Sequence, residues 1–268
     1  MASLRTVRLL SGGLGDGQAA GRRSYSQVMP EARYDAIADF YAAAFDEVDD
    51  PASTALLDLL GPPAGLRVVD IACGHGRITR ELARRGADVV GIDISARLIT
   101  KAVAAERDQP LGIGYIHADV TAAPADLGAA TFDAVTCNFG LSDIDNLDAA
   151  AAAVSGALKP AGRFVFAILH PCFSGAADVA SSWPATGSYY DEGLWTADAA
   201  LSPLRRQVGS NHRMLSTYLN ALRRHDLWLD HVREPAPEEQ WSQQRPRAGR
   251  TPVYLAARCL KSAPAPAD

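Results

Sequence analysis

Apolar and polar positions follow two rhythms along residues 31–170, and the change between them predicts the secondary structure. Compact apolar runs predict strands at 67–71, 88–93, 113–117, 132–138 and 163–169. Apolar residues spaced three or four apart predict helices at 31–48, 52–60, 77–86, 95–106 and 146–158. Strands that alternate with helices are typical of a doubly wound parallel sheet, so the predicted fold class is α/β.

The pattern changes in the last third of the chain. Residues 171–210 contain Pro, Gly, Ser and aromatic residues without a steady period. So long an irregular segment inside a domain is typical of a lid or a binding insertion. A helix is predicted at 211–224, with Asn211 as its N-cap. Strands at 226–233 and 252–259, joined by a polar, Pro-rich turn, are predicted to form an antiparallel hairpin.

Residues 66–95 carry the strongest functional signal, a strand–turn–helix–strand unit with an acid at the end of each strand. Asp70 ends the first strand, a turn of small residues leads into a helix that opens at Arg77, and Asp93 ends the second strand. Glycines in the turn let the backbone approach a ligand closely. The free N–H groups at the helix start attract a negative group, and a carboxylate at the tip of the next strand can accept both ribose hydroxyls. The unit therefore predicts a site for a nucleoside-bearing ligand.

The spacing of the turn separates two ligand classes. A dinucleotide site requires a third glycine inside the helix, and Arg77 stands at that position, where it would crowd a pyrophosphate. An NAD-dependent oxidoreductase is therefore disfavoured. A scaffold without a ligand is also disfavoured, because glycines in such a turn reduce stability unless something approaches the backbone. An acid followed by Ala72-x-Gly74-x-Gly76 resembles the first motif of class I S-adenosylmethionine (SAM)-dependent methyltransferases, with Ala72 in place of the first glycine. Alanine has the smallest side chain, so we expect the turn to be preserved if φ at Ala72 is negative.

The resemblance extends over about residues 34–260 and includes the turn at 158–163 before the fifth strand. It implies a seven-stranded, mostly parallel, Rossmann-like sheet with an N-terminal helical lid and an insertion after the fifth strand. It implies roles for Asp93 at the ribose, Asp119 at the adenine amine and Asp70 in organising the glycine turn and the SAM amino group. The expected SAM-binding residues are Tyr34, Asp70, Ala72, Cys73, Gly74, Gly76, Arg77, Asp93, Ile94, Asp119, Val120 and Asn138.

Candidate catalytic groups follow the predicted strands where the carboxyl edge of the sheet opens, the usual ligand crevice. His170 ends the fifth strand, and a histidine has a pKa suited to proton transfer near neutral pH. The other candidates are Asp143 after the fourth strand, Tyr190 in the insertion and His212 near the next predicted helix. The competing interpretation of His170 is a buried, hydrogen-bonded residue that shapes the loop.

The expected function is methyl transfer from SAM to a small, aromatic acceptor in secondary metabolism, since the stretches at 170–173 and 211–220 resemble actinobacterial natural-product methyltransferases. Indole C3 methylation with ring closure is one version of this hypothesis. The alternatives are O- or N-methylation of another small metabolite and a non-catalytic SAM-binding protein. A nucleic-acid methyltransferase is disfavoured, because the fourth strand leads into Asn138-Phe139-Gly140-Leu141 and not into an Asn/Asp-Pro-Pro motif.

Composition restricts these alternatives further. The chain has 268 residues, 48% hydrophobic and 21% charged, which suits one globular domain, expected at 29–260 between disordered tails at 1–28 and 261–268. The net charge of −5 argues against a nucleic-acid surface. Four scattered cysteines without a C-x-x-C pair predict no metal site and no disulfides, as in the cytoplasm. No apolar run is long enough for a membrane span, and a homodimer stays open.

Overall fold

The computed structural model describes residues 32–124, 127–173, 187–197, 203–244 and 250–262. The predicted N-terminal tail, most of the predicted C-terminal tail and part of the insertion lie outside these residues. No helix in the described part of the chain combines the length and the apolar character that a membrane crossing needs.

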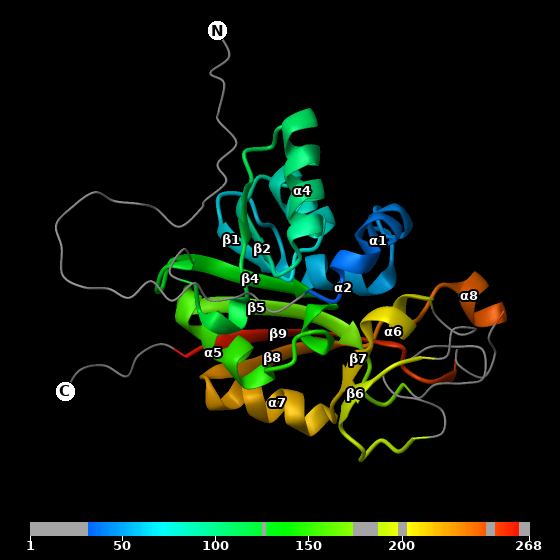
Figure 1. Cartoon of the computed structure of the whole chain (residues 1–268). Helices are drawn as coiled ribbons and strands as arrows, with labels where there is room; N and C mark the ends of the chain where they lie inside the picture. Colours follow the sequence, from blue (N-terminus) through cyan, green and yellow to red (C-terminus); the bar gives the residue numbers. More distant parts are fainter. Residues whose placement is uncertain (1–31, 125–126, 174–186, 198–202, 245–249, 263–268) are drawn as a thin grey trace, which may run out of the picture.

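A seven-stranded sheet forms the centre of the molecule (Figure 1). Its strands are β1 (Arg67–Ile71), β2 (Asp88–Asp93), β3 (Gly114–His117), β4 (Phe132–Asn138), β5 (Leu158–Leu169), β8 (Leu227–Arg233) and β9 (Tyr254–Lys261). They lie in the order β3-β2-β1-β4-β5-β9-β8, and only β9 runs antiparallel to its neighbours. The predicted α/β fold with a seven-stranded, mostly parallel sheet and a C-terminal hairpin is confirmed.

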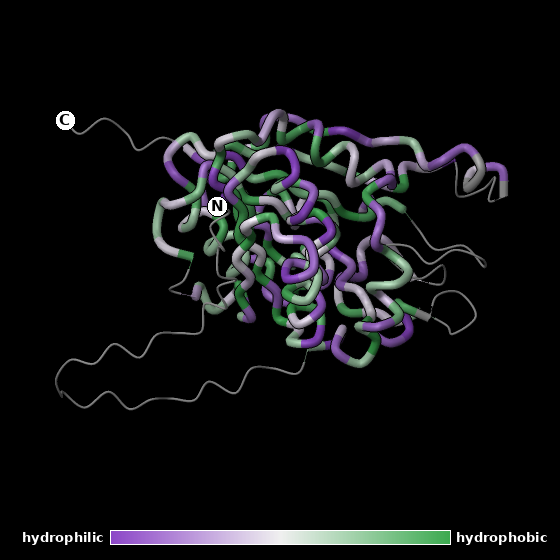
Figure 2. The backbone as a smooth tube through the Cα atoms, turned by 90° about the horizontal axis from the view of Figure 1, so that it is seen from above, coloured by the Kyte–Doolittle hydropathy of each residue, from purple (hydrophilic) through white to green (hydrophobic). Residues whose placement is uncertain are grey.

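Helices cover both faces of this sheet (Figure 1). They are η1 (Asp35–Ile37), α1 (Ala38–Ala44), α2 (Pro51–Leu60), α3 (Arg77–Arg84), α4 (Ala96–Asp108), η2 (Val120–Ala122), η4 (Gly140–Ser142), α5 (Leu147–Ala157), α6 (Pro203–Val208), α7 (Leu215–Arg224) and α8 (Glu239–Gln244). Val68 packs in one apolar cluster with α2 and α3, whereas Val69 packs in another with α5 and α7. This follows from the two-residue period of a strand, which sends successive side chains to opposite faces. The apolar stretches lie mostly in the interior of the fold (Figure 2).

The predicted helix at 31–48 is wrong in its extent. The chain forms the short helix η1 and then α1, which ends at Ala44, and Ile37 between them leaves helical geometry at φ −122° and ψ 13°. Phe40 and Phe45 have exposed fractions of 50% and 39%. Their helical spacing therefore does not mark a continuous buried face.

The predicted N-cap at Asn211 is also wrong. Residues 210–212 form the short strand β7 (Ser210–His212), which pairs with β6 (Gly193–Trp195) inside the predicted insertion. Helix α7 begins only at Leu215, with Met214 as its N-cap residue. The side chain of Asn211 instead donates to the backbone carbonyl of Ser142 and so binds a loop distant in sequence.

Candidate active site

The glycine turn between β1 and α3 has three residues in the left-handed region. Ala72, Gly74 and Gly76 have φ values of 52°, 60° and 91°. The condition of a negative φ at Ala72 is thus not met, and an L-residue in this region is strained by about 1–2 kcal/mol. Gly140 is the matching residue after β4, since a Cβ built there would lie 2.4 Å from the Cβ of Ala72. The sequence did not predict this close contact between Gly140 and the turn.

Tyr115 of β3 supports the glycine turn from the side of the sheet. A Cβ on Gly76 would lie 2.4 Å from the Tyr115 hydroxyl, and one on Gly91 would lie 2.8 Å from its ring. The hydroxyl is buried and has no hydrogen-bond partner among the described residues. The glycines at 76 and 91 are therefore required by the close approach of this ring, a contact that nothing in the local sequence indicates.

Two buried carboxylates flank the turn. Asp70 accepts hydrogen bonds from the hydroxyls of Thr79 and Thr136 at 2.7 and 2.8 Å. Asp93 accepts from the backbone N–H groups of Gly74 and Ser95 at 2.8 and 2.7 Å. Burial raises the pKa of each carboxyl to about 6, although these hydrogen bonds by themselves lower the pKa. A bound cation or a set of hydroxyl donors would favour their ionised forms.

Asn138, at the end of β4, lies where α2 meets the turn. Its Nδ2 donates to the Ser53 hydroxyl at 2.9 Å, and Arg77 donates to the same hydroxyl at 2.9 Å and to the Asp50 carboxylate at 2.9 Å. The Asn138 Oδ1 atom is buried without a hydrogen-bond partner among the described residues. Because a buried acceptor without a partner is costly, this atom fits the ammonium group of a bound amino acid moiety.

A cavity of about 230 Å³ opens at the carboxyl ends of β2 and β3. It brings together five residues predicted from the sequence, namely Ala72, Asp93, Ile94, Asp119 and Val120. Asp143, predicted as catalytic, also lines it, and Arg33 and Asn146 line it without having been predicted. The acids at the ends of β2 and β3 therefore face one space, as the topology of parallel strands requires.

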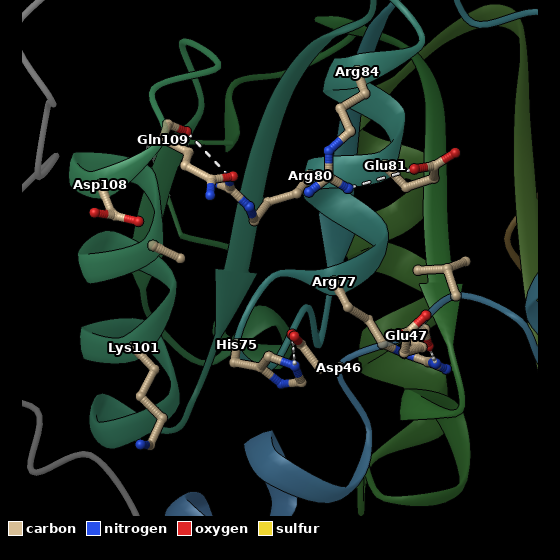
Figure 3. A pocket seen from close by; sticks show the side chains of 12 residues that line it. Asp46, Glu47, His75, Arg77, Arg80, Glu81, Arg84, Lys101, Asp108 and Gln109 are labelled. Carbon is tan, nitrogen blue, oxygen red and sulfur yellow. Dashed lines mark hydrogen bonds and ion pairs between the residues drawn. The ribbon is translucent and has the colours of Figure 1, made fainter.

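A larger cavity of about 530 Å³ lies on the other side of the turn, between α3, α4 and residues 46–48 (Figure 3). His75 of the turn lines it with an exposed fraction of 8%, and Asp46 stands 3.6 Å from its Nε2. Burial lowers the pKa of His75. The cations Arg77 and Arg80 also line this cavity, but carboxylates outside it already pair with both.

The comparisons agree with this geometry. Residues 69–166 match a family model described as a methyltransferase domain. Nocamycin O-methyltransferase of Saccharothrix syringae is 33% identical over 133 residues, which is 48% of this chain and 47% of that protein. The solved structure of an S-adenosylmethionine-dependent methyltransferase from Mesorhizobium loti is 29% identical, with a TM-score of 0.63, and the match covers 79% of this chain and 98% of that one.

This chain carries a class I SAM-dependent methyltransferase domain. It spans about half the length of the curated relatives that it matches. A Burkholderia thailandensis 1,6-didemethyltoxoflavin-N1-methyltransferase, solved with S-adenosylhomocysteine, has the same fold at 18% identity and a TM-score of 0.57, over 92% of this chain and 93% of that one. SAM is the cofactor, and it supplies an electrophilic methyl group when bound.

The residues of this methyltransferase domain fit SAM at both ends. Asp93 and Asp119 line the cavity where a ribose and an adenine would lie. Asn138 and Asp70 offer a carbonyl oxygen and a carboxylate near the turn, where the positive charge of the methionine moiety would be stabilised. Arg77 is held by the first turn of α2 and links that helix to the site. Cys73 is buried, and burial raises the pKa of its thiol, so it is not a nucleophile near neutral pH.

The structure does not bring all the predicted catalytic residues of the methyltransferase to the cavity. Asp143 lines it, but His170, His212 and Tyr190 do not. His170 has an exposed fraction of 3%, its Nδ1 accepts from the Cys172 backbone N–H at 3.0 Å, and its Nε2 lies 2.9 Å from the Glu234 carboxylate. Burial lowers its pKa. This geometry supports the structural interpretation of His170.

Of the other two candidates, Tyr190 lies in the predicted insertion and His212 lies just after it. His212 is buried in β7, and its Nε2 lies 2.8 Å from the backbone carbonyl of Tyr189. Tyr190 has an exposed fraction of 77%. The hydroxyl of its neighbour Tyr189 accepts a hydrogen bond from the backbone N–H of Leu215 at 2.9 Å. Catalytic roles for His212 and Tyr190 stay predictions.

Proposed function

We propose that this protein transfers the methyl group of SAM to a small aromatic acceptor. The observation that carries the proposal is an aromatic pair at the carboxyl edge of the sheet. Phe139 directly follows Asn138, and its ring centroid lies 6.2 Å from that of Tyr254 in an edge-to-face arrangement. Tyr254 opens β9 and pairs with Leu169 at the end of β5. Edge-to-face pairs of this kind offer planar surfaces to a further ring.

The backbone of Phe139 supports a functional role for this ring. Its φ is 61°, a genuine outlier for a bulky residue. Its N–H donates to the Ala167 carbonyl at 2.8 Å, and its own carbonyl accepts from the Ser142 hydroxyl at 3.0 Å. Such strain persists where the surroundings over-determine it and is concentrated at ligand sites. The strained turn directs the chain away from β4 and leaves the ring against Tyr254.

Methyl transfer is an in-line displacement, so the protein acts mainly by holding the acceptor opposite the leaving sulfur. A base is needed only where the acceptor carries a proton that it does not lose unaided. Transfer to a phenol or an amine is the simplest form of the proposal, and the similarity to a nocamycin O-methyltransferase supports transfer to an oxygen. Indole C3 methylation with ring closure is a narrower form that needs a proton acceptor. To serve there, His170 would have to exchange one of its two partners.

Other properties of the protein follow from the same proposal. We expect a cytoplasmic enzyme of secondary metabolism, and the four free cysteines are consistent with a reducing compartment. The net charge of −5 supports a small acceptor rather than a nucleic acid. A homodimer stays a prediction.

The test is a turnover screen with the full chain. S-adenosylhomocysteine (SAH) formation is measured with SAM and a panel of phenols, aromatic amines and indoles, beside aliphatic alcohols and amines of similar size. We expect turnover with aromatic members, and Tyr254→Leu should raise their KM about tenfold or more without changing the SAH dissociation constant. Trp228→Leu, a half-exposed aromatic on β8, is the matched control. Turnover confined to aliphatic members, or none by a protein that binds SAH, would contradict the proposal.

A further inference from the structure

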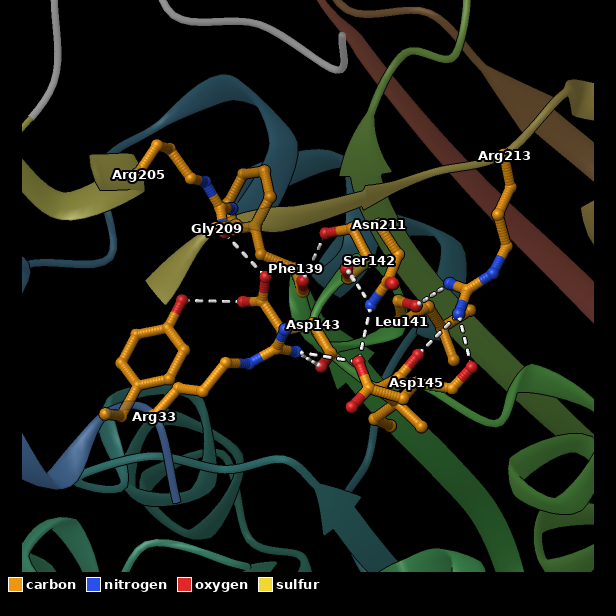
Figure 4. Close-up of polar contacts among 12 residues, drawn as sticks. Arg33, Phe139, Leu141, Ser142, Asp143, Asp145, Arg205, Gly209, Asn211 and Arg213 are labelled. Carbon is orange, nitrogen blue, oxygen red and sulfur yellow. Dashed lines mark hydrogen bonds and ion pairs between the residues drawn. The ribbon is translucent and has the colours of Figure 1, made fainter. Parts of the chain in front are cut away.

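The loop at 141–145, after β4, is held by side chains that come from distant parts of the sequence (Figure 4). All five of its backbone carbonyls accept a hydrogen bond. Arg213 donates to the first, fourth and fifth at 2.8, 2.6 and 2.8 Å, Asn211 donates to the second at 3.2 Å, and Arg33 donates to the third. The backbone of this loop therefore depends on the N-terminal segment and on the segment 205–213 together.

The carboxylate of Asp143 joins the same segments a second time. Its Oδ2 accepts from the Tyr34 hydroxyl at 2.6 Å, and its Oδ1 accepts from Arg205 Nη1 at 2.5 Å. Arg205, in α6, also donates to the Gly209 carbonyl at 2.9 Å. The exposed fractions of the Arg205 and Asp143 side chains are only 9% and 16%. Hydrogen bonds between charged groups are stronger where water is excluded.

This arrangement gives Asp143 a different role from the predicted catalytic one. Both of its oxygens are engaged, one by the Tyr34 hydroxyl and the other by the Arg205 guanidinium. Burial and the Asp143 charge together raise the pKa of Tyr34, so the phenol keeps the proton that it donates. The group is thus arranged to hold three segments together rather than to accept a proton from a substrate.

The same loop forms one wall of the cofactor cavity. Asp143 and Asp145 line the cavity with Arg33, and Asp93 and Asp119 line it as well. Arg205 is not among the lining residues. It contacts a lining residue through its ion pair with the carboxylate of Asp143.

We propose that Arg205 is a positioning residue for SAM binding. It holds Asp143, and through Asp143 it fixes Tyr34 and the loop at 141–145 in the conformation that forms the cavity wall. The coupling free energy between two sites is the same in both directions. Bound cofactor therefore stabilises the docking of segment 205–213 by the same free energy by which that docking strengthens cofactor binding. The inference rests on the proposed function only in requiring that the protein bind SAM, and it is independent of the acceptor.

Calorimetric titration of the full chain with SAH tests the proposal. Arg205→Met should raise the dissociation constant about fivefold or more, the lower end for coupled sites, and Arg205→Lys should restore part of the affinity. Tyr34→Phe should also weaken binding. Both residues act through Asp143. The fold-loss of SAH affinity in the double variant should therefore be smaller than the product of the two single fold-losses. Arg224→Met is the matched control, since Arg224 pairs with Asp148 on the exposed surface.

Two results would overturn the proposal. One is a wild-type SAH dissociation constant in folded Arg205→Met, with folding verified by near-ultraviolet circular dichroism. The other is strict multiplicativity of the Arg205 and Tyr34 effects. Should Arg205→Met not fold, Tyr34→Phe decides the matter, because it leaves the Arg205–Asp143 pair intact. Unchanged SAH binding in Tyr34→Phe also overturns the proposal. No step uses turnover, so failure of the aromatic acceptor screen is a separate outcome.

Discussion

SAH should bind more tightly as the pH rises through about 6, and Asp93 is the reason. A carboxylate offers about four lone-pair positions. In Asp93 one position on each oxygen is used by the backbone N–H groups of Gly74 and Ser95. The two that remain match the two ribose hydroxyls expected in the cavity. Protonation of Asp93 would place a hydrogen on one of these acceptors, so the ionised form is the one that binds.

The size of the effect follows from the pKa of this carboxyl. Burial raises it from 3.8 to about 6, which corresponds to about 3 kcal/mol in favour of the protonated form. In the protein without ligand, the contribution of Asp93 to the free energy of unfolding therefore falls as the pH rises from about 4 through 6. At pH 5 only about one tenth of the molecules carry the ionised carboxylate, so SAH should bind about tenfold more weakly there than at pH 8.

Calorimetric titration with SAH between pH 5 and pH 8 measures this dependence. Asp93→Asn places a donor opposite a backbone N–H and removes acceptors, so SAH affinity should fall about 100-fold and the slope due to this residue should vanish. Asp148→Asn is the control, because Asp148 is exposed and ion pairs with Arg224 and His225 hold its pKa below the usual value. A flat wild-type profile, or the same pH profile in Asp93→Asn, would refute the reasoning.

Packing around the glycine turn and between α3 and α4 gives four further predictions. Ala72→Gly should raise the melting temperature by removing about 1 kcal/mol of strain at a positive φ. Gly140→Ala should destabilise the fold by about 1–3 kcal/mol, and combining it with Ala72→Gly should recover part of the loss. Gly76→Ala should lose SAH binding and lower the melting temperature, because its Cβ would lie 2.4 Å from a buried tyrosine hydroxyl; unchanged binding would count against the packing described. Arg80→Met leaves buried Glu106 without its cation and should cost about 3–5 kcal/mol in urea unfolding, whereas a loss under 1 kcal/mol would show that the pair contributes little.

The order of strands and helices was predictable because it depends on local periodicity. The acids at the ends of β1, β2 and β3 were predictable for the same reason, since the carboxyl ends of parallel strands meet at one edge. Asp70, Asp93 and Asp119 lie within two residues of those ends. The glycine turn was recognisable from its spacing alone.

Predictions failed where a contact between distant segments decided the outcome. Asn211 has the side chain of a good N-cap, but β7 pairs with β6 and directs it to the loop after β4. Ala72 adopts a positive φ in a turn packed closely against Gly140. The extent of the helix predicted at 31–48 depends on which aromatic rings find a buried surface, and the rings at positions 40 and 45 do not.

The sequence by itself determined the class of cofactor, because the spacing of acids and glycines in one strand–turn–helix–strand unit is a local property. It also placed Asp143 near the site. Only the tertiary structure decided what Asp143 does there. Its partners Tyr34 and Arg205 lie 109 and 62 residues away along the chain, and no periodicity or motif reports a hydrogen bond between segments that meet only after the sheet has formed.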